Sequence, residues 1–368
     1  MNTSVPKKDD QPLVSFRNVQ KSYDGETLVV KNLNLDIHSG EFLSLLGPSG
    51  SGKTTCLMML AGFEFPSAGD IVLDGQNLNR VPPHKRDIGM VFQNYALFPH
   101  LTVERNVEYP LKVRRIGADE RRKRVAAALE MVQMGAFGKR YPRQLSGGQQ
   151  QRIALARALV FDPKLVLMDE PLGALDKQLR EHMQLELKAL HRSLGITFVY
   201  VTHDQSEALT MSDRVAVFDQ GVIQQVSSAD TLYELPSNRF VAGFVGDCNQ
   251  LPGTVQSASE ELCTVRLSDG SAIQALNVQN LRAGDPCILA VRPERIRLAP
   301  QATTNAVSAR TLDTVYFGDH IRLRCEAAGA PPLSVKLALG DHAGLSGLAP
   351  GAPVYLQAQP EHIRAFAP

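Results

Sequence analysis

The sequence predicts an α/β domain with a parallel β-sheet, followed by an all-β domain. Between residues 13 and 245, short apolar runs such as 164–168 and 197–202 alternate with helical stretches, which is typical of buried parallel strands joined by helices. After about Gly246 the helical periodicity fades, and short β-like segments punctuated by Gly and Pro take over. We therefore expect a second domain over 246–368, and a flexible polar tail over 1–12.

The second domain contains an internal repeat. One copy, AGDPCILAVRPERIR, ends at Arg297, and the other, PGAPVYLQAQPEHIR, ends at Arg364. Six positions match in phase, namely Gly284, Pro286, Pro293, Glu294, Ile296 and Arg297 with Gly351, Pro353, Pro360, Glu361, Ile363 and Arg364. A chance echo is the alternative, but two copies of a small β unit explain the phase better, so we predict an OB-like, barrel-type domain.

Composition excludes several classes of protein. The net charge of the 368 residues is +1, which argues against a nucleic-acid-binding protein, and the basic run 121–124 is interpreted as a solvated helix face. The five cysteines are scattered without C-x-x-C spacing, so neither a disulfide framework nor a zinc site is expected. No apolar run approaches the roughly 18 residues of a membrane span, so any work at a membrane would require partners.

A glycine-rich loop carries the clearest chemical signal. The segment GPSGSGKT matches the P-loop pattern and lies between an expected strand and an expected helix. Its backbone N–H groups would surround phosphate oxygens, Lys53 would reach the β- and γ-phosphates, and the Thr54 hydroxyl would bind Mg²⁺. The flanking strand and helix disfavour the alternative of a plain turn. The predicted nucleotide-binding residues of this segment are Gly47, Pro48, Ser49, Gly50, Ser51, Gly52, Lys53, Thr54 and Thr55.

Two further motifs supply acid groups and a second anion-binding loop. In LVLMDEP, an apolar strand delivers Asp169, expected to hold Mg²⁺ through water, and Glu170, expected to polarise the attacking water. A solvated acidic turn is the alternative for this motif alone. In LSGGQQQR, residues Ser146, Gly147, Gly148 and Gln149 form a small-residue loop at an expected helix N-terminus, where anions bind.

These motifs in this order resemble the nucleotide-binding subunits of ABC transporters, over roughly residues 13–245. The resemblance implies a P-loop ATPase fold with a helical subdomain at about 94–160, and ATP and Mg²⁺ as cofactors. It also implies a head-to-tail homodimer, in which Ser146 and Gly148 of one subunit contact the γ-phosphate held by the other.

Four further positions match the pattern of this family. The resemblance implies that Tyr23 stacks on adenine, that Gln93 approaches Mg²⁺ and the water, that Asp176 lies at the dimer seam, and that His203 contacts the γ-phosphate. Taken singly, each has a plainer interpretation: a strand-edge aromatic, a polar loop residue, a helix cap and a core histidine.

The C-terminal extension resembles the transport-associated OB-like domain of importer ATPases. Segment 81–103 is most similar to the ATP-binding subunits of spermidine/putrescine importers, and 244–255 points the same way, but ferric iron and sugar importers share these features. This branch implies two permease subunits and a substrate-binding protein as partners, and a location on the cytoplasmic face of the inner membrane. Apolar residues in the loop 93–100 would contact a permease helix or, alternatively, pack inside the helical subdomain.

Two other functions fit the sequence less well. A soluble ABC protein acting on nucleic acid or ribosomes usually carries two cassettes or a long coiled coil, and neither a second P-loop nor sustained heptads is present. A non-enzymatic binding module would have a degenerate cassette, whereas Lys53, Asp169, Glu170 and His203 are all intact.

Overall fold

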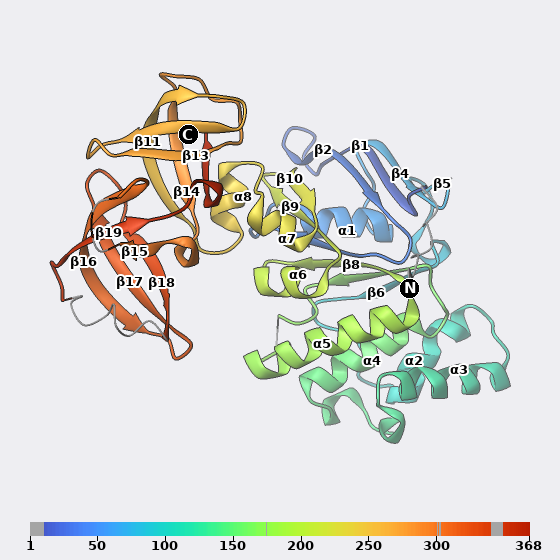
Figure 1. Cartoon of the computed structure of the whole chain (residues 1–368). Helices are drawn as coiled ribbons and strands as arrows, with labels where there is room; N and C mark the ends of the chain where they lie inside the picture. Colours follow the sequence, from blue (N-terminus) through green and yellow to red (C-terminus); the bar gives the residue numbers. More distant parts are fainter. Residues whose placement is uncertain (1–10, 174, 300, 302, 340–348) are drawn as a thin grey trace, which may run out of the picture. The chain divides into compact units, whose positions relative to one another are not determined.

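The computed structural model describes residues 11–173, 175–299, 301, 303–339 and 349–368, so most of the predicted tail over 1–12 lies outside the described residues. The chain divides into two compact units, Met1–Asp230 and Thr231–Pro368 (Figure 1). This division precedes the boundary expected after residue 245. The difference arises because helix α8 (Arg239–Phe244) packs on the C-terminal β structure, where Ala242 shares a core with Ala290 and Phe366.

Two sheets build the first unit. A four-stranded antiparallel sheet has the order β2-β1-β4-β5, with β1 Val14–Ser22, β2 Leu28–Ile37, β4 Ala68–Leu73 and β5 Gln76–Asn77. A six-stranded sheet has the order β10-β9-β3-β8-β7-β6. Its strands are β3 Phe42–Leu46, β6 Ile88–Val91, β7 Leu165–Asp169, β8 Thr197–Thr202, β9 Arg214–Asp219 and β10 Val222–Ser227. All pairs are parallel except β9–β10, so the prediction of a parallel sheet is confirmed.

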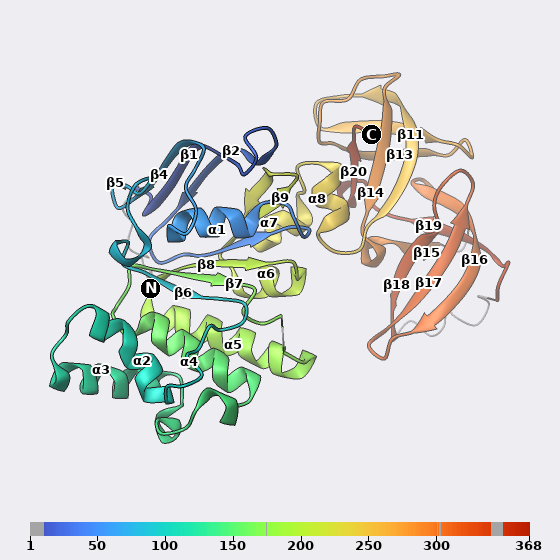
Figure 2. The same ribbon diagram turned by 180° about the vertical axis from the view of Figure 1, so that it is seen from behind.

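Helices cover both faces of the six-stranded sheet. Helix α1 (Lys53–Ala61) lies between the two sheets (Figures 1 and 2), and its Leu57 and Leu60 share one buried core with residues of both, such as Phe16 and Leu167. Helices α4 (Gly147–Leu159) and α5 (Lys177–Leu194) cover the opposite face. Burial on both faces explains why the central strands are continuous apolar runs in the sequence.

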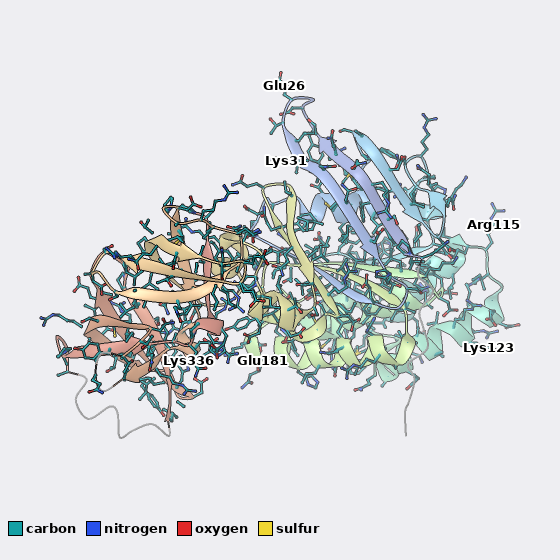
Figure 3. The ribbon with its side chains drawn as sticks, turned by 45° about the horizontal axis from the view of Figure 1, so that its top comes forward. Glu26, Lys31, Arg115, Lys123, Glu181 and Lys336 are labelled. Atoms are coloured by element: carbon teal, nitrogen blue, oxygen red, sulfur yellow. The ribbon has the colours of Figure 1, made fainter. Side chains whose placement is uncertain are left out.

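A helical region follows strand β6 in the chain, in agreement with the helical subdomain of the predicted fold class. Helices α2 (Val103–Val113), α3 (Ala118–Met131) and α4 share a core of their own. The basic run 121–124 lies on α3, from which Lys123 projects (Figure 3). Its Arg121 and Arg124 pair with Glu108 and Glu120 at 2.8 Å each, so much of its charge has a partner within this region.

The second unit is built mainly of strands, which confirms the predicted all-β domain. Strands β11 (Asn249–Ala258), β12 (Leu262–Leu267), β13 (Ala272–Asn277), β20 (Ile363–Phe366) and β14 (Pro286–Val291) close a barrel. The other sheet has the order β15-β19-β16-β17-β18. Its strands are β15 Arg297–Ala299, β16 Ala306–Tyr316, β17 His320–Ala327, β18 Leu333–Ala338 and β19 Pro353–Gln357. The first copy of the repeat runs from barrel to sheet and the second from sheet to barrel, and both contribute to one core.

Helices α6 (Gln205–Met211), in the first unit, and α7 (Ala229–Glu234), before α8, complete the helical elements named here. Among the described residues, no helix is both long and apolar enough to cross a membrane.

Candidate functional site

The P-loop joins β3 to α1, and its glycines are required by close backbone approaches. A Cβ on Gly47 would lie 2.3 Å from the carbonyl oxygen of Phe218. Gly52 has φ of 102°, and a Cβ there would lie 2.9 Å from the carbonyl oxygen of Val29. Neither position admits a larger residue, because the obstacles are backbone atoms that cannot rotate away.

The ammonium group of Lys53 is buried within the same loop. Its Nζ donates hydrogen bonds of 2.8 Å to the carbonyl oxygens of Gly47 and Pro48, and one of 3.3 Å to Ser51 Oγ. Burial lowers the pKa of Lys53, while Glu170 and Asp169 oppose this change. A cation that is this poorly hydrated gains strongly from an anionic ligand.

Asp169 ends β7 beside the start of α1. Its Oδ1 accepts a hydrogen bond of 3.1 Å from the hydroxyl of Thr54. Burial raises the pKa of Asp169, an effect that the hydrogen bond from Thr54 reduces. The pair comes together because β3 and β7 are parallel strands of one sheet, whose carboxyl ends lie at the same edge.

Glu170 and His203 follow adjacent strands and face each other. His203 Nδ1 lies 3.2 Å from Glu170 Oε2. The backbone of Glu170 has φ of 44°, and its N–H donates to the carbonyl oxygen of Val201 in β8 at 3.1 Å. A left-handed conformation is costly for a residue other than glycine, and here the hydrogen bond to Val201 helps to hold it. The structure therefore brings together five predicted residues, Lys53, Thr54, Asp169, Glu170 and His203.

The predicted second anion-binding loop begins α4. Ser146 caps the helix, with its Oγ accepting from Gln149 N at 3.4 Å and its own N–H donating to Gln149 Oε1 at 3.0 Å. A Cβ on Gly147 or Gly148 would lie 3.3 or 3.2 Å from the side chains of Leu175 and Leu179, respectively. This loop therefore packs against the start of α5, whereas the bonds of Lys53 lie within its own loop.

Asp176 caps α5, accepting from Leu179 N at 3.0 Å. Helix capping is the plainer of the two interpretations of Asp176. Asp176 is also exposed beside the Ser146 loop, and its position at a dimer seam stays a prediction.

Two residues that were predicted to contact the nucleotide or Mg²⁺ lie at the surface. The ring of Tyr23 is 60% exposed, with Lys21 Nζ 4.8 Å from its centre, and its hydroxyl lies 3.5 Å from Thr55 Oγ1. An exposed aromatic face beside the P-loop helix suits a flat ligand. Gln93 is exposed in the loop after β6, and no side-chain contact with the other site residues is recorded for it in the described part of the chain. Both roles stay predictions.

The comparisons identify the family. The ABC transporter model matches residues 30–173, and the TOBE domain model matches residues 289–366. The spermidine/putrescine import ATP-binding protein of Rubrobacter xylanophilus is 50% identical over 315 residues, covering 85% of this chain and 83% of that protein. The chain belongs to the ABC transporter ATP-binding proteins. The corresponding protein of Acidothermus cellulolyticus is 45% identical over 361 residues, covering 96% of this chain and 94% of that protein.

Solved structures agree with this assignment. A dimeric ATP-binding cassette in a post-hydrolysis state, bound to ADP and Pi, has 38% identity and a TM-score of 0.53, covering 59% of this chain and 98% of that one. The protein cbiO1 of Clostridium perfringens, described as part of the ABC transporter complex cbiONQ, has 29% identity and a TM-score of 0.57, covering 61% of this chain and 91% of that one. The predicted ABC ATPase fold is therefore confirmed.

One residue of this ABC subunit was missed by the sequence analysis. Arg180 in α5 donates to the carbonyl oxygen of Leu175 at 3.0 Å and lies 3.3 Å from Asp204 Oδ2. It thus ties the segment around Asp176 to the loop that carries His203. No motif marked Arg180, because its partner Asp204 lies 24 residues away in the sequence and only the fold brings the two together.

The apolar loop after Gln93 packs partly inside the helical region and partly lines a groove, and contact with a permease stays a prediction. Tyr95 is buried, and its carbonyl oxygen accepts from Arg157 at 2.7 Å. Phe98 is half-buried against Tyr109, with ring centres 4.7 Å apart, and lines an open groove of about 460 Å³. The rest of the groove is mostly apolar and includes Phe63, Met90, Phe92, Val113 and Phe161.

Proposed function

We propose that this chain is the ATP-hydrolysing subunit of a polyamine ABC importer. In this role it forms a homodimer, binds two permease subunits fed by a substrate-binding protein, and lies on the cytoplasmic face of the inner membrane. The observation that carries the ATPase role is the meeting of a buried lysine, a hydroxyl, two carboxylates and a histidine at the carboxyl ends of adjacent parallel strands. The substrate class rests on extensive identity with relatives named for spermidine/putrescine import.

The site suits magnesium together with a nucleotide. Mg²⁺ prefers oxygen ligands and is usually held by one or two protein groups plus substrate phosphates. Thr54 and Asp169 offer a hydroxyl and a carboxylate 3.1 Å apart, which fits this chemistry. Bound there, the ion would neutralise charge on the β- and γ-phosphates.

Glu170 and His203 are placed to act on the attacking water and the γ-phosphate. Glu170 would accept the proton of the water, or orient it, because its carboxylate follows directly after the Asp169 that marks the metal site. His203, 3.2 Å from that carboxylate, would hold it in place and donate toward the phosphate. Within this scheme Arg180 keeps the His203 loop in register with α5.

The dimer role follows from the distribution of phosphate-binding groups. Lys53 and the P-loop can surround one side of a γ-phosphate, but the Ser146 loop packs against Leu175 and Leu179 instead. A second copy can supply that loop if the two subunits pair head-to-tail around a two-fold axis. The dimeric solved relative is consistent with this arrangement.

The groove beside Phe98 is the proposed docking site for a permease. It is lined mainly by apolar side chains, as a groove for an amphipathic helix should be. Asn106 fixes the loop at its edge, since its side-chain amide donates to the carbonyl oxygens of Phe98, Leu101 and Thr102. A rigid apolar edge of this kind can transmit movement to a partner helix.

The experiment is transport by the reconstituted complex. The chain is co-expressed with candidate permease subunits and a candidate substrate-binding protein, and the complex is placed in proteoliposomes with ATP and Mg²⁺. We expect uptake of labelled spermidine, and a rise of ATPase rate when the loaded binding protein is added. Uptake of ferric iron or a sugar instead would overturn the polyamine assignment but keep the ATPase role, whereas absence of ATP hydrolysis would overturn both.

A further inference from the structure

The C-terminal unit is built around an internal two-fold relation. Strands β14 and β20 pair with Ala290 opposite Arg364, and β19 and β15 pair with Gln357 opposite Arg297. In the repeat, Ala290 aligns with Gln357 and Arg297 aligns with Arg364. The same antiparallel register therefore occurs twice, and a feature that one copy builds has a twin built by the other.

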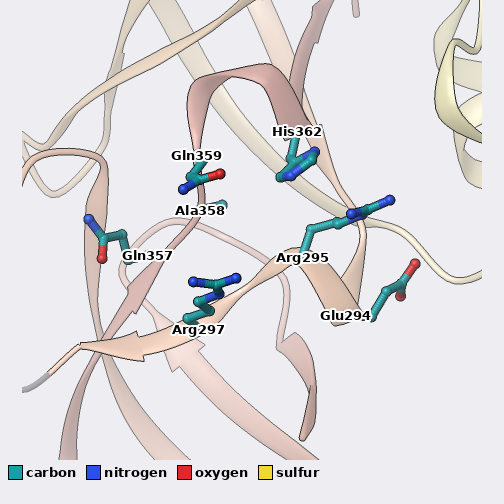
Figure 4. Close-up of a pocket in the computed structure, with 7 residues that line it drawn as sticks. All are labelled: Glu294, Arg295, Arg297, Gln357, Ala358, Gln359 and His362. Carbon is teal, nitrogen blue, oxygen red and sulfur yellow. The ribbon is translucent and has the colours of Figure 1, made fainter.

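Each copy opens a pocket at its 3₁₀ turn. The first, here called the open pocket, is lined by Glu294, Arg295, Arg297, Gln357, Ala358, Gln359 and His362 (Figure 4). The second, here called the filled pocket, includes Val291, Arg292 and Arg364. These three align with Ala358, Gln359 and Arg297 of the open pocket, and Arg295 and His362, which align with each other, line both. The two pockets are therefore related by the internal two-fold.

The chain itself occupies the filled pocket. The segment around α7 and α8 contributes Tyr233, Glu234, Pro236 and Ala242, and a space of only about 10 Å³ remains. Arg292 donates to backbone carbonyl oxygens of this segment, at 2.9 Å to Ala242 and 3.2 Å to Tyr233. Arg295 pairs with the carboxylate of Glu234 at 2.6 Å. This pocket thus receives a polypeptide turn by its carbonyl groups and one acidic side chain.

The open pocket has the same design and about 150 Å³ of space. The Arg297 guanidinium points into it, toward Gln359 (Figure 4), and no ion pair to Arg297 is recorded among the described residues. The buried Nε of Arg295 also has no hydrogen-bond acceptor in the described structure. Gln359 stands where the filled pocket has Arg292, and its amide can likewise donate to a carbonyl oxygen.

We propose that the open pocket binds an acidic turn of a partner polypeptide. A carboxylate of that turn would pair with Arg297, and a backbone carbonyl would accept a hydrogen bond from the amide of Gln359. The carboxylate of Glu294 does not compete for this role, because it accepts a hydrogen bond from the Tyr233 hydroxyl of the filled pocket. The partner is a polypeptide, rather than a free anion, because the twin pocket is shaped around one.

Fluorescence anisotropy with the full-length chain tests this inference. The probe is a labelled synthetic peptide of residues 230–247, the segment that fills the twin pocket, and a second peptide carries Glu234→Gln. We expect the wild-type chain to bind the first peptide saturably and Arg297→Glu to weaken this binding at least tenfold. The Glu234→Gln peptide should not bind the wild-type chain saturably. Gln359→Arg should tighten binding severalfold, because it recreates the Arg292 of the filled pocket. Arg310→Glu, an equal change of charge at an exposed strand position, should have little effect.

Three outcomes would overturn the proposal. One is the absence of saturable binding to both the wild-type chain and the Gln359→Arg variant. Another is equal weakening by Arg297→Glu and Arg310→Glu, which would indicate general charge attraction. The third is displacement of the peptide by inorganic phosphate at an equal concentration, which would indicate a small-anion site. All variants should hydrolyse ATP normally, since none alters the ATP site, and the binding assay does not depend on the transported substrate.

Discussion

The ammonium group of Lys53 donates hydrogen bonds to the carbonyl oxygens of Gly47 and Pro48. A bound phosphate would replace these neutral acceptors with anionic ones. Replacing Lys53 with Ala removes the cation without filling the loop. We expect hydrolysis to fall by about 100-fold or more, by analogy with the loss of one transition-state donor. The measurements are the ATPase rate and the affinity for ATP. Lys31→Ala, at an exposed lysine (Figure 3), is the control, and similar rates for both variants would contradict the assignment.

Asp169 gives a prediction about pH. Burial raises its pKa in the folded chain above the unfolded value, so the folded state binds the proton more tightly and loses stability as pH rises through the raised pKa. Asp169→Asn keeps an acceptor for Thr54 but removes this ionisation. Without nucleotide, the melting temperature of the variant minus that of the wild type should therefore increase as the pH rises above about 4, the pKa of an ordinary aspartate.

The same variant should lose its response to the ligand. Wild-type chain should gain about 2.7 kcal/mol when MgATP is present at 100 times its Kd, whereas the variant lacks the carboxylate proposed to hold Mg²⁺ and should gain much less. Differential scanning fluorimetry at several pH values measures both effects. A stability difference that is independent of pH would refute the buried, ionising Asp169.

At this scale, the sequence predicted residues whose chemistry is local. Gly47 and Gly52 are dictated by their own backbone surroundings, and a glycine-rich motif records that need. Arg180 could not be predicted, because its acceptors Leu175 and Asp204 belong to different loops. The left-handed backbone of Glu170 was equally hidden, since it depends on a hydrogen bond to the neighbouring strand β8.

At the scale of elements, the strands and helices of the first unit were predictable because buried parallel strands are continuous apolar runs. The exact division of the chain was not, because α7 and α8 are short and lack a periodic pattern of their own. Their attachment depends on Arg292, whose guanidinium donates hydrogen bonds to the carbonyl oxygens of Tyr233, Ala242, Gly246 and Asp247.

Arg292 therefore carries a prediction about stability. Arg292→Ala leaves several buried carbonyl groups without a donor, which costs about 1–3 kcal/mol for each group that water does not reach. We expect the free energy of unfolding of the C-terminal unit to fall by about 2–3 kcal/mol, measured by urea denaturation of the whole chain. Arg297→Ala, an exposed arginine of the same repeat, should change it by less than about 0.5 kcal/mol. Equal effects would mean that Arg292 has no special structural role.

At the scale of the whole molecule, the ATP site of one chain is one-sided, and this predicts an assembly that depends on ATP. Glu170→Gln keeps the shape of the site but removes the carboxylate that we propose acts as the base for the water. We expect this variant to bind ATP and accumulate as a dimer, seen by size-exclusion chromatography with ATP and Mg²⁺. With ADP it should elute as a monomer. A variant that hydrolyses ATP normally would show that Glu170 is not the base.

The proposed action across the dimer would separate this protein from P-loop enzymes that complete their site within one chain. The Ser146 loop packs against Leu175 and Leu179, and we propose that a γ-phosphate bound near Lys53 receives this loop from a second copy. Ser146→Arg should place a bulky cation in that loop and abolish hydrolysis, as Lys53→Ala does. Each variant alone forms dimers in which both composite sites carry a lesion.

Mixing the two inactive variants provides the test. In a mixed dimer, one composite site combines both lesions, and the other combines an intact P-loop with an intact Ser146 loop. If the two sites fire independently, random mixing of equal amounts makes about half of the dimers mixed, so activity should recover to about one quarter of wild type. Differently tagged subunits allow the mixed dimer to be purified and its ATPase rate measured directly. A purified mixed dimer without activity would argue against independent sites. An ATP-bound dimer with Ser146 beside the nucleotide of its own subunit would overturn action in trans, because the loop would then serve its own P-loop.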